Sequence, residues 1–357
     1  MKRIISILMA ISIFSIFASA ETDINKWWEG KRYEVNGISY CINKIQLTDA
    51  EYTGAIVVPT DNNELKFRGD VTIPLDVMID GTTYPVICFT ALTNFEENIK
   101  DLKSLTISEG VKVVSYFEGA RGRIKRLSLP STLTELYIMA YQPDTLSIPG
   151  SVKIIGYQAG VGADILYLED GVEVCDHYSL YCNNKTLTIP GTAVMTFYAL
   201  NAPELECLYI KKDTRNSGQS FEDTFCPYSY KIEYVINENT TPTKVAKDAF
   251  RLASYDDVDQ PGMYDRATLY VPKAAIEAYK ADAEWGRFEK ILAIEDNADI
   301  IKKLEGVDDI SADAAEVVAT EYYDLSGRRL EAPAERGITI TATIYSDGTR
   351  RCAKTVR

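Results

Sequence analysis

The chain has 357 residues, and its 52 acidic and 38 basic side chains give it a formal net charge of −14. A chain this acidic lacks the positive surface that nucleic-acid phosphates and anionic membranes require. We therefore expect neither as a partner. The seven cysteines form no CxxC pair and there is one histidine, so we expect no metal site. We expect buried, unpaired cysteines, with a structural disulfide as the alternative.

Residues 1–20 have the pattern of a secretory signal peptide. Lys2 and Arg3 precede an apolar run over 4–18, and Ala18-Ser19-Ala20 is a small-x-small cleavage site. The apolar run is too short for a membrane span, and no later segment is apolar enough to be one. We therefore expect an exported protein without a transmembrane segment in the mature chain. Its expected location is the cell surface or the extracellular space, with the periplasm as the fallback.

Residues 21–70 are predicted to form an N-terminal β cap made of hairpins. The runs at 33–40 and 55–58 are rich in strand-forming residues, and Asn36-Gly37 between two halves of the first run is a strong turn signal. The pair Trp27-Trp28 is expected to pack inside this cap, and a sugar-stacking platform is the alternative.

Residues 71–272 carry a repeat that predicts the fold class. An apolar-x-apolar signature recurs with spacings of 22, 19, 20, 21 and 21 residues, at 105–107, 127–129, 146–148, 166–168, 187–189 and 208–210. A period near twenty lies at the short end of the leucine-rich-repeat range. We therefore predict a β-rich solenoid of short leucine-rich repeats, in which each coil packs only against its neighbours.

The middle residue of each signature should point away from the core, because side chains alternate along a strand. These residues form a column of candidate ligand-binding side chains: Thr106, Ser128, Ser147, Tyr167, Thr188, Tyr209 and Tyr270. Tyrosine offers a large contact area at a low cost in side-chain entropy. The alternative, given equal weight, is a solvated sheet face that uses threonine and tyrosine for their β propensity.

Residues 273–295 are predicted to form a helical cap, because 273–293 has the clearest helical pattern of the chain. Trp285 should pack in this cap and Gly286 should bend or end the helix. Residues 296–320 are weakly patterned and are assigned as a linker. Residues 321–357 are predicted to form a small β tail with glycine-containing turns.

The sequence contains no P-loop, GxSxG, HExxH, SxxK or dinucleotide-binding motif, so we expect no enzymatic activity, no catalytic residue and no cofactor. Cys175, Asp176 and His177 are a nucleophile, an acid and a base side by side. In an extended segment Cys175 and His177 would share a face and Asp176 would not, whereas a catalytic relay needs all three to converge. The acidic run at 256–259 lacks the ligand spacing of an EF-hand and is expected to be a solvated loop.

Taken together, these residues resemble the BspA-type leucine-rich-repeat proteins of Bacteroidetes over roughly 30–295. The segment 148–156 (IPGSVKIIG) is similar to the family repeat, and 69–87 and 268–288 are similar to its first repeat and its terminal cap. The family's small–aromatic step is matched at 91–92, 199–200 and 249–250. Other residues stand at that step in the middle repeats, which leaves their exact register open: Glu118, Gly160 and Ser179.

The tail is similar to the C-terminal sorting regions that the type IX secretion machinery reads. The similarity rests on 322–330 (YYDLSGRRL), Gly337-Ile338 and 346–348, and it departs at Thr339, where an aromatic residue is usual. The resemblance implies the secretion machinery as a partner of the tail, and surface attachment or release as its result. A plain accessory β unit is the alternative.

These observations predict a secreted or cell-surface binding protein, and the resemblance implies adhesion to host or bacterial surface ligands. The ligand would be a protein or a glycan of unknown identity. One alternative is a structural surface component without a specific ligand, which is favoured if Tyr167, Tyr209 and Tyr270 are covered. The other is an accessory protein of a glycan-degrading system, which would need converging carboxylates or a deep pocket.

Overall fold

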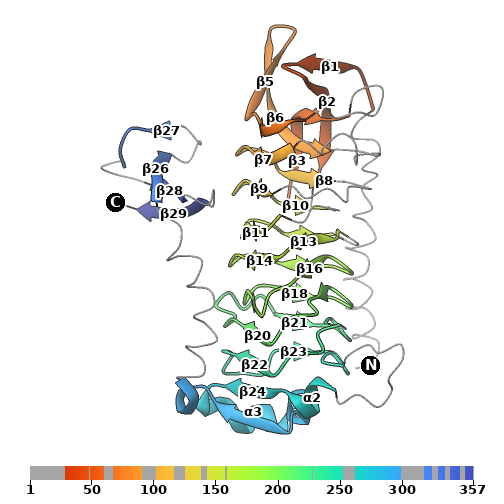
Figure 1. The fold of residues 1–357 in the computed structure, drawn as a ribbon, viewed down its shortest axis with the longest axis vertical. Coiled ribbons are helices and arrows are strands. Elements are labelled where there is room, and N and C mark those ends of the chain that lie inside the picture. The colour runs from red at the N-terminus through yellow and green to blue at the C-terminus, as the bar shows by residue number, and fades with distance from the viewer. Residues whose placement is uncertain are drawn as a thin grey trace.

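The computed structural model describes residues 29–47, 49–59, 67–90, 102–115, 125–137, 143–156, 159–226, 228–251, 262–298, 317–323, 329–333, 338–345 and 350–356. Between residues 29 and 298, the described parts of the chain wind into stacked coils that form an elongated solenoid (Figure 1). The helices of the described residues are short and lie at the C-terminal end of the solenoid. Within the described part of the chain, no helix is long and apolar enough to cross a membrane.

The first wall of the solenoid is a long sheet that gains one short strand from each coil. It is parallel from β3 onward, and β5 (Asp76–Ile79) adds an antiparallel hairpin arm to it. Its strands in spatial order are β1 (Arg32–Val35), β2 (Ile38–Gln46), β3 (Glu51–Val57), β6 (Thr82–Thr90), β8 (Val113–Ser115), β10 (Glu135–Leu136), β12 (Ile154–Ile155), β15 (Val174–Cys175), β18 (Val194–Met195), β21 (Ser220–Phe221) and β23 (Lys244–Val245).

The second wall, which we call the repeat sheet, contains the strands that the sequence repeat predicts and further strands that it does not, among them β22 and β25, whose bounds are given below. It has two parallel parts. The first contains β4 (Gly69–Ile73), β7 (Leu102–Ile107), β9 (Arg126–Ser128), β11 (Thr145–Ile148) and β14 (Ile165–Leu168). The second contains β17 (Thr186–Ile189), β20 (Cys207–Ile210), β22 (Tyr234–Asn237), β24 (Thr268–Val271) and β25 (Lys290–Ala293).

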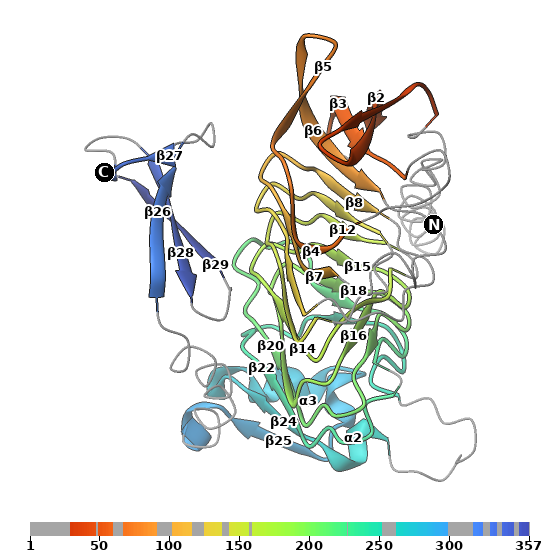
Figure 2. The same ribbon diagram turned by 45° about the horizontal axis from the view of Figure 1, so that its top comes forward.

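A short third wall joins the other two in the middle coils. Its parallel strands are β13 (Val161–Ala163), β16 (Leu180–Cys182) and β19 (Leu200–Asn201). Figure 2, turned to bring the N-terminal end forward, shows the walls surrounding a common interior. The solenoid predicted from the repeat is therefore correct.

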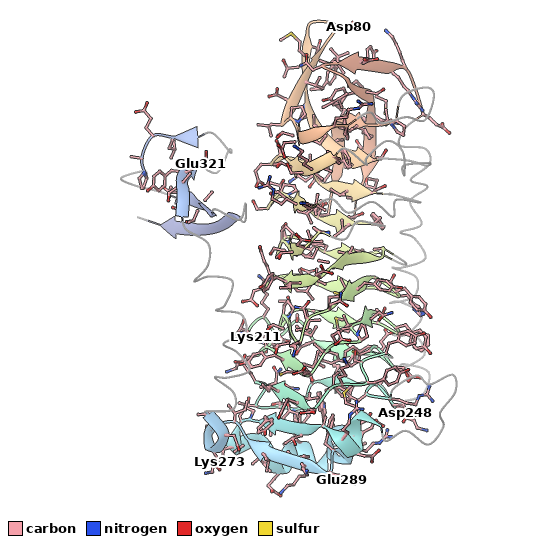
Figure 3. The ribbon with its side chains drawn as sticks, viewed as in Figure 1. Asp80, Lys211, Asp248, Lys273, Glu289 and Glu321 are labelled. Atoms are coloured by element: carbon pink, nitrogen blue, oxygen red, sulfur yellow. The ribbon has the colours of Figure 1, made fainter. Side chains whose placement is uncertain are left out.

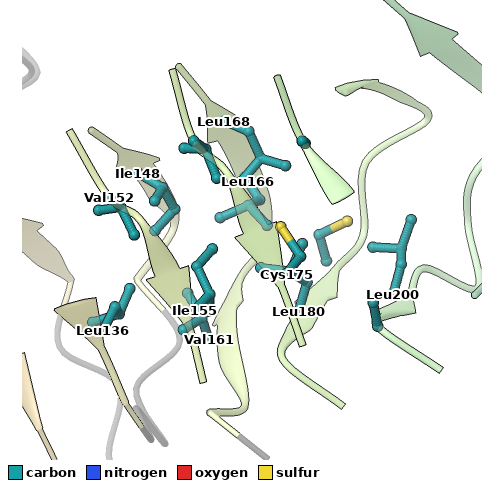
Figure 4. Close-up of a cluster of buried hydrophobic side chains, with 14 of the residues drawn as sticks. Leu136, Ile148, Val152, Ile155, Val161, Leu166, Leu168, Cys175, Leu180 and Leu200 are labelled. Atoms are coloured by element: carbon teal, nitrogen blue, oxygen red, sulfur yellow. The ribbon is translucent and has the colours of Figure 1, made fainter. Parts of the chain in front are cut away.

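Inward-pointing aliphatic side chains from all three walls fill that interior. Leu146 and Ile148 of the repeat sheet are buried, as are Ile155 of the long sheet and Val161 of the short one. Figure 4 shows these layers meeting between successive coils. The repeat signature thus supplies one wall of the core, and burying such side chains stabilises the fold by roughly 1.5–3 kcal/mol each.

At the N-terminal end, β1 and β2 form the predicted hairpin around Asn36 and Gly37. Both turn residues have positive φ, 51° and 77°, as a two-residue type I′ turn requires. Val35 pairs with Ile38 across this turn. Trp27 and Trp28 lie outside the described residues.

At the C-terminal end, the prediction of a helix over 273–293 is wrong in its second half. The cap contains α2 (Met263–Arg266), η2 (Lys273–Ala275), α3 (Ile276–Ala281), η3 (Trp285–Arg287) and η4 (Glu295–Asn297). Residues 290–293 form β25 instead, because Ile291 pairs in register with Leu269 and extends the repeat sheet by one strand. Trp285 is buried as predicted, and its indole N–H donates to the Thr243 carbonyl at 3.0 Å.

The tail is a four-stranded antiparallel sheet. Its strands are β26 (Val317–Tyr323), β27 (Arg329–Leu330), β28 (Ile338–Tyr345) and β29 (Arg350–Val356). The first strand begins within the range assigned to the linker, so the β unit starts before the predicted boundary at 321. The turn residues at 326–327 and 346–349 lie outside the described residues.

Candidate functional site

The predicted column of outward-facing residues exists, but its exposure changes along the solenoid. Thr106 pairs with Ser128, Ser147 with Tyr167, and Thr188 with Tyr209 on adjacent strands. Ser147 is exposed, and Thr106, Ser128, Tyr167 and Thr188 are half-buried. Tyr209 and Tyr270 are only 4% and 3% exposed, so these two cannot form the exposed contact surface that the sequence predicted.

The two tyrosines are buried because the sequence pattern missed the strand between them. Strand β22 places Ile236 between Tyr209 and Tyr270 on the outer face, and the three form an apolar cluster with Cys207. The Tyr209 hydroxyl donates to Glu238 Oε1 at 2.6 Å, and Lys211 Nζ lies 5.1 Å from the centre of the Tyr209 ring. At this end of the repeat sheet, the side chains on the outer face therefore form a packed layer of their own, separate from the solenoid core.

A different surface gathers half-exposed aromatic rings, at the turn that follows strands β15, β18 and β21. His177 lies 4.7 Å from Phe197, and Phe197 stacks on Tyr198 at 3.9 Å between ring centroids. Tyr198 also lies 5.4 Å from Tyr178 and 6.3 Å from Tyr228. We call these five residues the aromatic corner. All five are half-buried.

The backbone of this corner repeats an uncommon conformation on successive coils. Tyr178, Tyr198, Thr224 and Asp248 have φ values of 52°, 54°, 48° and 63°. Left-handed backbone costs roughly 1–2 kcal/mol for a residue other than glycine. A row of hydrogen bonds holds it: Tyr178 N–H donates to the Tyr198 carbonyl, Tyr198 N–H to Thr224, and Thr224 N–H to Asp248.

Carboxylates line the same corner. Asp176 Oδ1 accepts hydrogen bonds from His177 N–H at 2.7 Å and from the Thr196 hydroxyl at 3.2 Å. Glu222 Oε2 accepts one from Phe197 N–H at 3.4 Å. Partial burial raises the pKa of Glu222, and the nearby charge of Asp176 raises it further, while the Phe197 hydrogen bond and His177 lower it. The corner is thus an aromatic surface with an excess of negative charge.

The sequence carries a signal for this corner that is separate from the repeat signature. The pairs His177-Tyr178 and Phe197-Tyr198 lie one repeat period apart, and in each case one residue separates the pair from the preceding strand of the long sheet. The signature identifies the repeat sheet only, because the strands of the long sheet have two or three residues in the middle coils. So short a strand leaves no alternating pattern to detect.

The hypothetical relay of Cys175, Asp176 and His177 does not converge. Cys175 ends β15 and points into the core, where burial raises its thiol pKa to about 12. A nucleophilic cysteine needs a lowered pKa and access to substrate. His177 turns outward into the aromatic corner, so Cys175 and His177 do not share a face, contrary to the alternation that we expected.

One groove, with a volume of about 630 Å³, lies at the N-terminal end of the solenoid. The β1–β2 turn, β4 and β5 line it, and its lining includes Asp70 and Asp76 but no residue of the predicted column. Asp70 is held by the Ser104 hydroxyl at 2.5 Å and by Arg126 at 3.7 Å. Among the described residues, no cluster of three or more metal-ligating side chains is present. The acidic run at 256–259 lies outside them.

Comparison with known proteins gives no matching family model and no matching curated protein. Among solved structures, the chain is similar to the pneumococcal vaccine antigen PcpA, with 12% identity and a TM-score of 0.25 over 74% of this chain and 98% of that one. It is also similar to a leucine-rich cell surface protein from Faecalibacterium prausnitzii, with 12% identity and a TM-score of 0.21 over 74% of this chain and 95% of that one.

Proposed function

We propose that this chain is an exported, surface-associated recognition protein without enzymatic activity, and that it binds a macromolecular ligand through the aromatic corner. The signal-peptide pattern at 1–20 supports export. The solenoid supports a binding role, because a stack of coils presents long outer walls to a partner. The single observation that carries the proposal is the row of half-exposed rings beside carboxylates. Tyrosine and other aromatic residues dominate the energetics of protein interfaces.

The resemblance to BspA-type proteins supports adhesion as the biological purpose of this binding, with a host or bacterial surface protein or glycan as the ligand. The resemblance of the tail supports recognition by the type IX secretion machinery. A deletion of 321–357 should leave the solenoid folded, because its core is built from residues before 298. The truncated protein should fail to reach the surface of its host cell, and correct surface delivery would remove this part of the proposal.

The binding proposal is tested by removing two rings without disturbing the backbone. Asparagine tolerates left-handed backbone better than most residues, so Tyr178→Asn with Tyr198→Asn should keep the corner turn. The matched control is Met78→Asn, which removes a side chain that is 65% exposed on the β5 arm at the other end of the solenoid. Purified protein and both variants would be screened against extracellular-matrix proteins, mucins and glycans, with circular dichroism to verify folding.

We expect saturable binding that is lost in the Tyr178/Tyr198 variant and retained in Met78→Asn. Binding that survives in the corner variant but disappears in Tyr167→Ala would move the site to the exposed part of the repeat sheet. Tyr167 is the half-buried tyrosine of the predicted column, so that variant tests the column directly.

A structural surface component without a specific ligand is the second candidate, and one observation favours it. Tyr209 and Tyr270 are buried, so the repeat sheet offers a continuous exposed face only over its earlier coils. Absence of binding to every class in the screen, together with an ordered array of the protein on the cell surface, would support this second function over the first.

A further inference from the structure

The C-terminal cap contains an internal example of what the corner surface can bind. The guanidinium carbon of Arg287 lies 3.9 Å from the centre of the Tyr264 ring. Its Nη1 is 2.7 Å from both Asp248 Oδ1 and Glu284 Oε2. A planar cation is therefore held between an aromatic face and two carboxylates, which combines cation–π attraction with charge-assisted hydrogen bonds.

This guanidinium lies on the coil at which the hydrogen-bond row of the aromatic corner ends. Asp248 is the fourth residue of the left-handed row, after Tyr178, Tyr198 and Thr224. Figure 3 labels Asp248 at the edge of the solenoid, near its C-terminal end. On this coil, the C-terminal cap therefore places its own side chain, Arg287, beside the end of the row.

The preceding coils offer the same chemical groups. Glu222 is exposed and accepts a hydrogen bond from the Phe197 N–H, and Asp223 follows it in the chain. Asp176 is half-buried and accepts hydrogen bonds from the His177 N–H and from the hydroxyl of Thr196, the residue before Phe197. Within the described parts of the chain, no lysine or arginine forms an ion pair with any of these three carboxylates. The negative charge of Asp176 instead raises the pKa of Glu222. A cation placed between the two carboxylates would offset this repulsion.

We propose that the aromatic corner binds an arginine side chain of an extended, basic segment in a partner protein, the guanidinium lying against a ring and bridging the carboxylates of Asp176 and Glu222. This inference rests on the proposed function and specifies its ligand. Arginine is favoured over lysine, because the planar guanidinium both stacks on aromatic rings and donates to two carboxylates at once. The acidic body of the protein, with its net charge of −14, would attract such a segment from solution.

The test uses the purified full chain and fluorescently labelled peptides of one length that alternate glycine with arginine, lysine or citrulline. Citrulline keeps the planar shape of arginine and removes its charge. Binding would be followed by fluorescence anisotropy at low salt and again at high salt. We expect arginine peptides to bind at least about tenfold more tightly than citrulline peptides, because only arginine can form charge-assisted hydrogen bonds. Lysine peptides should be intermediate, and salt should weaken the binding of both charged peptides.

Isosteric variants locate the site. Asp176→Asn and Glu222→Gln keep an oxygen that can accept the hydrogen bonds from His177 and Phe197, so both should fold. Together they should weaken arginine-peptide binding about tenfold or more. The matched control is Glu277→Gln, which removes an exposed carboxylate of α3 that pairs with Lys280 and should leave binding unchanged.

Three outcomes would overturn the proposal: equal binding of arginine and citrulline peptides, equal losses in the Asp176/Glu222 and Glu277 variants, or no binding of arginine peptides at all. Each is separable from failure of the proposed function. If the corner variant Tyr178→Asn with Tyr198→Asn still loses a ligand from the surface screen, the recognition role stands and its ligand is not a guanidinium.

Discussion

Asn184 and Leu166 exchange two hydrogen bonds across neighbouring coils. The Leu166 N–H donates to Asn184 Oδ1 at 2.9 Å, and Asn184 Nδ2 donates to the Leu166 carbonyl at 3.0 Å. Asn184 is 7% exposed and precedes the repeat-sheet strand β17, and its Nδ2 also reaches the Thr186 carbonyl at 3.2 Å. The side chain therefore replaces a stretch of sheet where β14 and β17 are not paired, and joins the two parts of the repeat sheet.

Replacing Asn184 with alanine should lower the free energy of unfolding by about 2–4 kcal/mol, because two buried backbone groups of Leu166 lose their partner. Chemical denaturation measures this change. The control is Asn183→Ala at the adjacent exposed position, whose hydrogen bond to Asp164 is on the surface and should contribute less than about 1 kcal/mol. Equal effects of the two substitutions would contradict the role assigned to Asn184.

Gly191 should not tolerate even alanine. A Cβ atom at this position would lie 2.2 Å from the Lys212 carbonyl oxygen of the next coil, so the two coils would have to separate. We expect Gly191→Ala to destabilise the protein by about 2–4 kcal/mol. Gly262→Ala is the matched control, since its Cβ would meet nothing closer than Asp265 Oδ2 at 3.5 Å. Its cost should stay within about 1 kcal/mol, and thermal unfolding compares the two variants.

The cysteines should be slow to react in the folded protein. The side chains of six of the seven are described, and all six are buried. Burial raises the pKa of Cys41 and Cys182 to about 11, and that of Cys226 to about 12. The thiolate is the reactive form. An aromatic disulfide reagent at neutral pH should therefore label these six cysteines slowly, so that no more than one cysteine, Cys352, reacts quickly. In denaturant without reductant it should label all seven, and a smaller number would reveal a disulfide.

Stability should depend on pH through Glu222. The pKa of Glu222 is raised in the folded protein, chiefly by burial. At pH values between the ordinary glutamate pKa and this raised pKa, the folded state therefore binds more protons than the unfolded state. Stability contributed by this group is therefore lost as pH rises through that interval. Glu222→Gln should unfold at the same denaturant concentration as the parent protein near about pH 4 and at a higher one near pH 7. A difference that does not change with pH would contradict this assignment.

Most of the repeat sheet was predictable from the sequence because its strands have three to six residues and all but a few carry the apolar-x-apolar pattern. Leu187 and Ile189, for example, are both buried where the pattern places them. The short strands of the long sheet in the middle coils were not predicted, since a strand such as Val194-Met195 is too short to show alternation and is defined by its neighbours in the stack. For the same reason, residues 290–293 have a helical pattern but form a strand on the edge offered by β24.

The candidate site was the harder part. Sequence alternation correctly turned Tyr209 and Tyr270 away from the core, but it could not show that Ile236 lies between them and that this outer face is packed. The aromatic corner depends on left-handed turns at Tyr178 and Tyr198, a conformation that tyrosine rarely adopts. Contacts between coils impose it, and a single sequence does not record them.

The row of hydrogen bonds along the corner also has an electrical direction. Each N–H points toward the C-terminal end of the solenoid, from Tyr178 to Tyr198, Thr224 and Asp248, so the peptide dipoles add as they do in an α-helix. The positive end is the Asp248 N–H, which donates to Glu284 Oε2 at 3.1 Å. Glu284 therefore does for the stacked coils what an acidic N-cap does for a helix. The terminal cap closes the solenoid electrostatically as well as sterically.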